Sequence, residues 1–181
     1  MTSIRPSERY HPLLRALHWL TALLIAAMFV LGGWIVYFDP GDGPLKDTLY
    51  HLHESTGATI WVLVLVRIAL RLATGAPRLP PGTPGAVRVL SGLNQLALYV
   101  VLLVQPVIGL ADANAWGVEL RWYGLFAVPS LIARRPEADA QALSDLHWYG
   151  AALLLALLAL HVAGALYHGI VRRDGVLQRM L

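Results

Sequence analysis

The stretch that decides the fold is HWYGAALLLALLALHVAGALYHGIV, residues 147–171. It contains three histidines and no Asp, Glu, Lys or Arg. As a helix it is about 37 Å long, enough to cross a hydrocarbon core of about 30 Å. It therefore predicts a helix that spans a membrane.

Three more apolar runs of similar kind precede it, so the prediction extends to the whole chain. The chain has 181 residues, of which 57% are apolar and 14% charged, whereas soluble domains are about 45–50% apolar and about 25% charged. We expect spans at about 13–38, 56–72, 87–111 and 147–171. The predicted fold is all-α, an integral membrane four-helix bundle forming a single domain over residues 1–181.

Composition also excludes several kinds of chemistry. The chain has no cysteine, which excludes thiolate-held iron–sulfur clusters, c-type haem attachment and Cys-based zinc sites. Its net charge of +3 comes with no basic tract interleaved with aromatic residues, so we expect no nucleic acid among its partners. The bilayer is the partner that the composition predicts.

The distribution of charge predicts the orientation. In a four-span chain the N-terminus, the second connection and the C-terminus share one side, and these carry ten basic and two acidic residues. The opposite side carries four basic and nine acidic residues, so the net charges are +8 and −5. Because basic residues are retained on the cytoplasmic side, both termini are expected there.

Two histidines on the fourth span are the first candidates for function. His147 and His161 are 14 residues apart, which puts them within about 40° of each other around a helix and about 21 Å apart along it. Ionisable residues inside spans usually mark functional sites. The two cannot share one metal atom at that distance, so the spacing predicts two sites stacked across the membrane.

Depth in the membrane predicts the partner of each histidine. His18 lies early in the first span, in the inner half with His161, whereas His53 lies just before the second span, at the level of His147. Two His–His pairs with apolar surroundings suit two bis-imidazole haems, whose iron takes nitrogen ligands on both faces. The pairing predicted is His18 with His161 and His53 with His147. His51 is rejected as the ligand because it lies about 200° around the helix from His53.

Small residues and one arginine complete the candidate cofactor sites. Gly32 lies 14 residues after His18 and Gly57 one turn after His53, where glycine would let a porphyrin approach the backbone; close helix packing is the alternative. Arg67 lies inside the second span on the His53 stripe. It either pairs with a haem propionate or a quinone head group, or extends its side chain to the membrane surface.

The connection over about 112–146 allows two interpretations. It contains four aromatic residues, Trp116, Trp122, Tyr123 and Phe126. Such residues suit an amphipathic segment at the membrane interface. An ordered loop in water is the alternative, and the sequence favours neither.

Several motifs together resemble the bacterial cytochrome b561 family. They are RALHWL (15–20), LHESTG (52–57), VRIALRL (66–72), LYVVLLVQPVIGL (98–110), LHWYGA (146–151) and LALHVAGALYH (158–168). The resemblance covers residues 10–180 and implies a dihaem cytochrome with haem b at both sites. It also implies a location in the bacterial inner (cytoplasmic) membrane, which the chain would cross several times. It departs from the family at GLNQLALY (92–99), where some members have further histidines.

The resemblance also implies electron exchange with the quinone pool, and ubiquinone is the expected electron acceptor. For the best-known bacterial type it implies oxidation of superoxide, so a superoxide:ubiquinone oxidoreductase is one hypothesis. Quinone would bind near Arg67, Arg71, His168 or Arg172. The first alternative is a cytochrome b subunit that relays electrons between quinol and a partner dehydrogenase or a periplasmic redox protein. The second is a haem-free transporter or structural bundle whose histidines handle protons.

Overall fold

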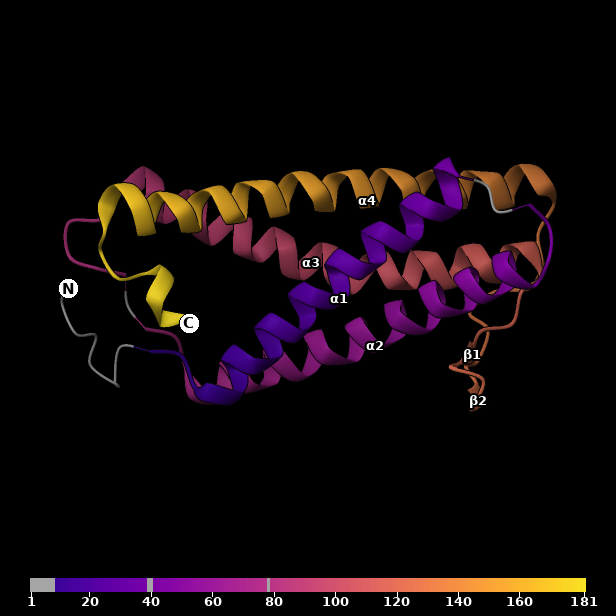
Figure 1. The fold of residues 1–181 in the computed structure, drawn as a ribbon, viewed down its shortest axis with the longest axis horizontal. Helices are drawn as coiled ribbons and strands as arrows, with labels where there is room; N and C mark the ends of the chain where they lie inside the picture. Colours follow the sequence, from indigo (N-terminus) through magenta and orange to yellow (C-terminus); the bar gives the residue numbers. More distant parts are fainter. Residues whose placement is uncertain (1–8, 39–40, 78) are drawn as a thin grey trace.

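Four long helices make up most of the chain (Figure 1). The computed structural model describes residues 9–38, 41–77 and 79–181. The helices are α1 (Pro12–Tyr37), α2 (Pro44–Thr74), α3 (Gly85–Trp116) and α4 (Glu137–Leu166). A π-helix (Tyr167–Arg172) continues α4, and a 3₁₀ turn (Leu177–Arg179) ends the chain. Each long helix is apolar enough to cross a membrane, which confirms the predicted all-α membrane bundle.

Proline and glycine set the ends of these helices. Pro12 and Pro44 occupy the first turns of α1 and α2, where the missing N–H of proline costs nothing. Gly75 follows α2 with φ 74°, and Gly117 follows α3 with φ 87°. This left-handed backbone is open to glycine without strain. Local sequence therefore explains where α1 and α2 begin and where α2 and α3 end.

The helices are longer than the apolar runs that predict them. The second begins at Pro44 instead of residue 56, and the fourth at Glu137 instead of residue 147. Both extensions are polar, and Asp47, Glu137 and Asp139 lie in first turns, where acidic side chains stabilise the helix N-terminus. The predicted 112–146 connection consequently shrinks to residues 117–136. It holds a two-stranded antiparallel ribbon, β1 (Arg121–Trp122) and β2 (Phe126–Ala127).

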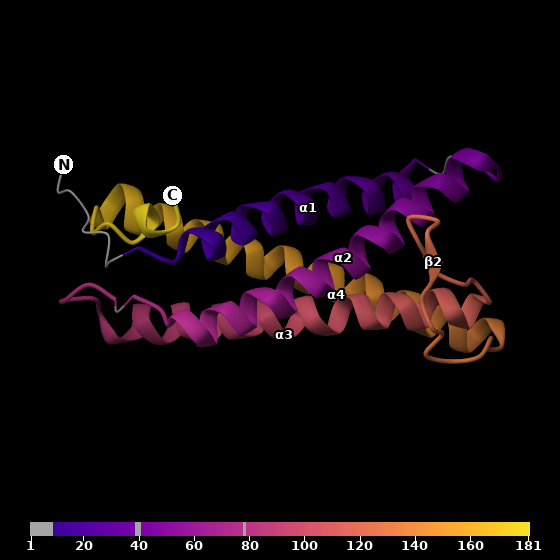
Figure 2. The same cartoon turned by 90° about the horizontal axis from the view of Figure 1, so that it is seen from below.

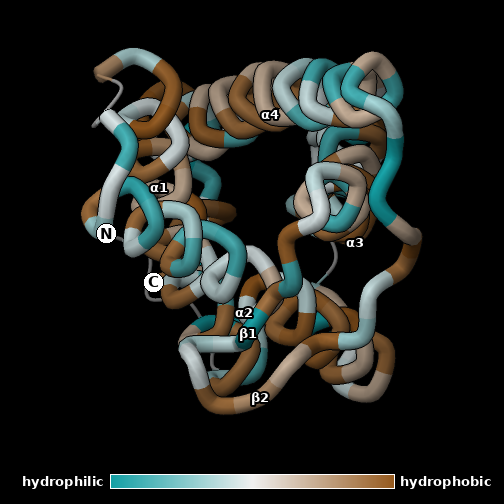
Figure 3. The backbone as a smooth tube through the Cα atoms, turned by 90° about the vertical axis from the view of Figure 1, so that its right-hand side faces the viewer, coloured by the Kyte–Doolittle hydropathy of each residue, from teal (hydrophilic) through white to brown (hydrophobic). Residues whose placement is uncertain are grey.

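The start of α1 and the C-terminus lie at one end of the bundle, which we call the near end, and the β1–β2 ribbon lies at the far end (Figures 1 and 2). Seen from the far end, the four helices surround a common axis, with α2 opposite α4 (Figure 3). Consecutive helices pack together, whereas α1 and α4 pack little. The charge count behind the expected orientation includes Arg5, Glu8, Asp39 and Arg78, which are outside the described residues.

An apolar layer fills the middle of the bundle. Its buried members are Ile25, Ile60, Val64, Leu98, Leu102 and Leu154. Leu154 is seven residues from both His147 and His161, so the layer lies about 10 Å from each. Elsewhere the helix surfaces are apolar and open: at most 17% of the residues in any of the four apolar windows are buried. Lipid must therefore cover them.

Candidate cofactor sites in the bundle

At the near end, α1 and α4 each present a histidine to the other. The rings of His18 and His161 lie next to each other, with their centroids 6.1 Å apart and their planes tilted by 53°. Arg67 of α2 joins them, its Nη2 lying 3.0 Å from His18 Nδ1, with its guanidinium 5.9 Å from the Tyr99 ring centre. Arg67 is only 9% exposed. Its side chain therefore stays inside the bundle, which is contrary to the alternative of an arginine extended to the membrane surface.

A second pair lies toward the far end. The rings of His53 on α2 and His147 on α4 have centroids 6.2 Å apart. His51 is exposed, so of the two neighbouring histidines it is His53 that faces the bundle. His53 lies within α2 and not before it, because α2 begins at Pro44. The structure thus brings together the same two histidine pairs that depth in the membrane predicts.

The separation of the rings suits one metal atom between them. Metal–imidazole bonds are about 2.0–2.1 Å long, and the ring centre lies about 1.1 Å beyond the nitrogen, so a bridged pair has centroids about 6.3 Å apart. Both observed distances, 6.1 and 6.2 Å, are close to this value. In the described part of the chain no three His, Asp or Glu side chains gather as metal ligands. Each site thus offers two imidazoles at a separation that fits a haem iron, which takes nitrogen ligands.

Polar atoms at both sites lack partners, as expected where a group is to be bound. His53 Nδ1 and Arg67 Nε are buried without a hydrogen-bond partner in the described residues. A buried polar atom that stays unpaired costs about 1–3 kcal/mol. Each of these two atoms could therefore form a hydrogen bond with a polar ligand or a bound water, and the Arg67 Nε–H would be the donor in its bond.

The glycines differ in what they contact. A Cβ on Gly32 would lie 3.3 Å from His53 Cε1, and one on Gly109 would lie 2.8 Å from His147 Cε1. Gly57 instead meets Met28 of α1 at 3.6 Å, which is helix packing and not contact with the histidines. Gly164, three residues after His161, has open space around it. The absence of a side chain at Gly32 and Gly109 thus leaves space for the rings of His53 and His147.

Two residues of α3 at the far pair were not predicted. Gln105 Nε2 lies 3.2 Å from His147 Nδ1 and donates to the His147 carbonyl oxygen at 2.6 Å. Gly109 follows one helical turn later, on the same face. An amide in the middle of an apolar helix is the signal that could have identified Gln105, since polar groups in spans are costly unless paired.

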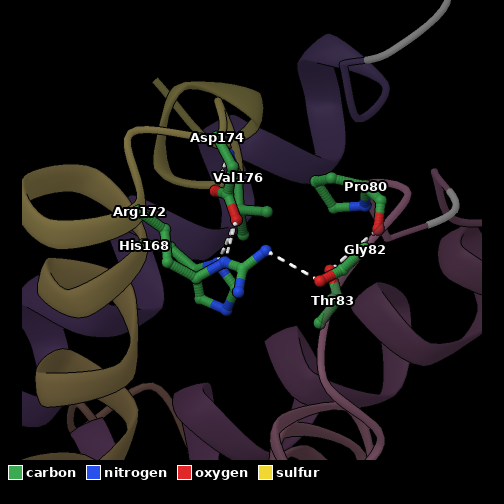
Figure 4. A network of polar contacts seen from close by, with 7 residues as sticks. All are labelled: Pro80, Gly82, Thr83, His168, Arg172, Asp174 and Val176. Carbon is green, nitrogen blue, oxygen red and sulfur yellow. Dashed lines mark hydrogen bonds and ion pairs between the residues drawn. The ribbon is translucent and has the colours of Figure 1, made fainter.

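A polar network closes the near end (Figure 4). His168 is 4% exposed, and its Nδ1 lies 2.7 Å from Asp174 Oδ2. Arg172 donates to the same oxygen at 2.9 Å and to the Gly82 carbonyl oxygen at 3.2 Å. The network therefore ties the π-helix to the loop before α3. Of the predicted quinone residues, it joins His168 and Arg172, whereas Arg71 contacts Tyr10 and Gln95.

Asp174 should make this closure sensitive to acid. Burial works to raise the pKa of its carboxyl, but hydrogen bonds from His168, Arg172 and the Val176 N–H outweigh it and hold the pKa below its usual value. The carboxylate therefore stabilises the fold fully above the ordinary Asp pKa of about 3.9, and this contribution is lost as the pH falls through the lowered pKa. The protection of residues 173–181 from hydrogen exchange, relative to the intrinsic rate at each pH, should fall in that acid range.

Asp174→Asn should show fast exchange in this segment already at neutral pH, with the acid step gone. Asp145→Asn, an exposed acid bonded only to Gln141 among the described contacts, is the matched control and should behave like the parent. An acid step of the same size in Asp174→Asn would assign the closure to another group.

Four spanning helices with two close imidazole pairs are typical of helical membrane cytochromes. The model of the prokaryotic cytochrome b561 family matches residues 9–181. The chain belongs to this family, whose members transfer electrons in bacterial membranes with b-type haem.

Curated relatives match over almost their full length. Cytochrome b561 homolog 2 of Escherichia coli (strain K12) is 31% identical, with 100% of this chain and 95% of the relative aligned. Homolog 1 of the same organism is 26% identical over 91% of this chain and 92% of the relative. A protein named probable superoxide oxidase CybB from Yersinia pestis is 27% identical over 96% of both chains.

Proposed function

We propose that this protein is a dihaem cytochrome of the bacterial inner membrane that carries electrons between a donor at the far, periplasmic end and quinone at the near, cytoplasmic end. The observation that carries the proposal is the pair of ring separations, 6.1 and 6.2 Å. His18 and His161 would hold one haem b, and His53 and His147 the other. Haem b, when bound, supplies a couple that accepts and gives up one electron at a time.

Arg67 has a specific role in this proposal. An arginine only donates hydrogen bonds, so His18 Nδ1 accepts from it in the present arrangement. A histidine that binds metal through Nε2 carries its proton on Nδ1, and two donors would then face each other. Arg67 would need a carboxylate acceptor, and a haem propionate is one.

Replacing Arg67 with glutamine should lower the reduction potential of one haem and leave the other unchanged. A buried cation favours the reduced, less positive form, so its loss should cost on the order of 50–100 mV. Potentiometric titration with optical detection measures both potentials. Arg71→Gln is the control, since Arg71 is held by Tyr10 and Gln95 and not by a histidine. Equal shifts of both haems in Arg67→Gln would contradict the assignment.

The near end supplies donors for a quinone. A quinone carbonyl accepts hydrogen bonds, and reduction to the quinol takes two electrons and two protons. Arg71, His168 and Arg172 carry N–H groups there. Asp174 is bonded to Nδ1 of the buried His168, so Nε2 of His168 is the ring atom that would bind a ligand. Ubiquinone is the acceptor we propose.

Superoxide is the donor that the name of the Yersinia relative favours. The residues that the sequence predicts on the far side carry a net charge of −5, which would repel an anion. This charge favours the second candidate, in which the donor is a partner dehydrogenase or a periplasmic redox protein. Arg134 does not reverse this, because it shares an open pocket of about 370 Å³ with Glu119. The charge and the relative thus point in different directions.

Two measurements test the proposal. The purified protein should bind two haems per chain with the spectrum of six-coordinate, low-spin haem b; a haem-free or monohaem protein from haem-replete cells would contradict it. Stopped-flow mixing with superoxide then separates the donors. Haem reduction faster than spontaneous dismutation supports superoxide, whereas slower reduction assigns the role to a protein donor.

A further inference from the structure

The β1–β2 ribbon lies on the outward side of α2. His53 points into the bundle toward His147, and Ser55 follows two residues later, about 200° around the helix. Ser55 therefore belongs to the face of α2 that points away from the bundle, yet it is 0% exposed. The ribbon and its flanks, residues 120–128, cover it. In Figures 1 and 3 the ribbon lies beside α2 on the side away from α4.

Three hydroxyl side chains of α2 anchor residues 120–128. Ser55 Oγ accepts the Tyr123 N–H at 2.9 Å, Thr56 Oγ1 and the Tyr123 hydroxyl are 3.2 Å apart, and the Trp122 indole N–H donates to Thr59 Oγ1 at 3.0 Å. Without the ribbon the Ser55 hydroxyl would face outward from a membrane-spanning helix, while Thr59 Oγ1 also donates to the Ser55 carbonyl oxygen within α2 at 2.9 Å. The ribbon thus supplies polar partners at a position of α2 where lipid could not supply them.

The anchoring contacts lie within the depth of the bundle. Thr59 is six residues beyond His53 toward the near end, about 9 Å along the helix. The ribbon is thus hydrogen-bonded to α2 from the level of the far histidine pair to about 9 Å closer to the near end. The apolar run IWVLVLV (60–66) begins directly after Thr59, so the ribbon lies where α2 passes from polar surroundings into lipid.

The outward surface of the ribbon is apolar and aromatic. Tyr123, Leu125 and Phe126 are 43%, 70% and 55% exposed. The rings of Trp122 and Phe126 lie with their centroids 5.3 Å apart and their planes tilted by 30°. Arg121 is exposed beside them. Aromatic, leucine and arginine side chains on one surface are typical of the boundary between lipid head groups and acyl chains.

Backbone hydrogen bonds within the ribbon also suit this boundary, because they pair polar groups that lipid could not satisfy. Leu125 N bonds Trp122 O at 2.9 Å, Gly124 N bonds Arg121 O at 3.1 Å and Val128 N bonds Leu120 O at 2.8 Å. Tyr123 adopts φ 44°, a strained value for a residue with a side chain. Its hydroxyl and its N–H are both bonded to α2, which holds the turn in this shape.

We propose that residues 120–128 are seated in the membrane leaflet at the far end, with the side chains of Leu125 and Phe126 in lipid and Arg121 among the head groups. The continuity of this surface with the lipid-facing side of α2 favours lipid over another protein as its partner. The proposal is independent of the haem ligands and of the electron donor.

Spin labels test it directly, because the chain has no cysteine and each single-cysteine variant carries one label only. Leu125→Cys is labelled in protein reconstituted into phosphatidylcholine–phosphatidylglycerol vesicles. Collision with oxygen, which concentrates in lipid, is compared with collision with a water-soluble nickel complex. Leu155→Cys on α4, 56% exposed, is the control in lipid, and Ala138→Cys, an exposed residue of the first turn of α4, is the control in water.

The label at Leu125 should resemble the one at Leu155, with an oxygen-to-nickel collision ratio several-fold above that at Ala138. A ratio equal to that at Ala138 would overturn the proposal, since the ribbon would then lie in water. Protection from both reagents would overturn it too, because a second protein surface would cover the ribbon. Phe126→Cys repeats the measurement on β2 and distinguishes a local effect of the label from the position of the ribbon.

Discussion

His161→Ala should remove one haem and leave the other in place. The two proposed sites share no ligand, since His161 faces only His18 and His147 faces only His53 among the seven histidines. The apolar layer around Leu154 separates them. Haem content should fall from two per chain to about one, and the remaining spectrum should be that of the His53–His147 site.

The reciprocal variant and a neighbour supply the controls. His53→Ala should lose the other spectral component, so that the two variants together account for the parent spectrum. His51→Ala, two residues away but exposed, should keep both haems. If His161→Ala lost both haems while remaining folded, as judged by circular dichroism and gel filtration, the ligand pairs would have to be reassigned.

The histidine pairs were predictable because helical periodicity determines them. A helix of known direction gives each residue a depth in the membrane and an angle around the helix axis. Residues 14 positions apart, such as His147 and His161 on α4 or His18 and Gly32 on α1, lie on nearly the same face of their helix. His18, His53, His147 and His161 could be matched by depth alone. Gly32 follows from the same arithmetic and contacts His53, whereas Gly57, chosen only for its nearness to His53 in sequence, packs against Met28.

The ends of α2 and α4 could not be predicted from hydropathy. An apolar window detects the part of a helix that lies in lipid, and the backbone can continue as a helix into water when its first turn is well capped. Pro44 and Asp47 start α2 outside the apolar run, and Glu137 and Asp139 do the same for α4. The membrane boundary and the helix boundary are therefore separate quantities.

Contacts between segments far apart in the sequence were also missed. The ribbon reaches α2 through Trp122 and Tyr123, more than sixty residues from their partners, and no local pattern encodes that pairing. Arg172 near the C-terminus likewise reaches the carbonyl oxygen of Gly82, 90 residues away. Such positions depend on tertiary structure, which a single sequence does not supply.

Gly109→Ala should disable the far site while leaving the bundle intact. A Cβ there would lie 2.8 Å from Cε1 and 3.2 Å from Nδ1 of His147, so the imidazole must move away from its position opposite His53. A side-chain ring moves more readily than a helix backbone. Alanine is also the better helix former by about 1 kcal/mol, so the stability of α3 should not fall on that account.

A graded series of glycine variants separates this effect from general changes in packing. Gly32→Ala, whose Cβ would lie 3.3 Å from His53 Cε1, should lose less haem than Gly109→Ala, and Gly164→Ala, with nothing within 4 Å, should lose none. Haem per chain and the spectrum of the His53–His147 component measure the order. A loss as large in Gly164→Ala as in Gly109→Ala would show that glycine is needed for helix packing in general. The predicted order would show instead that glycine on α3 is needed because the far imidazole occupies the space where a methyl group would lie.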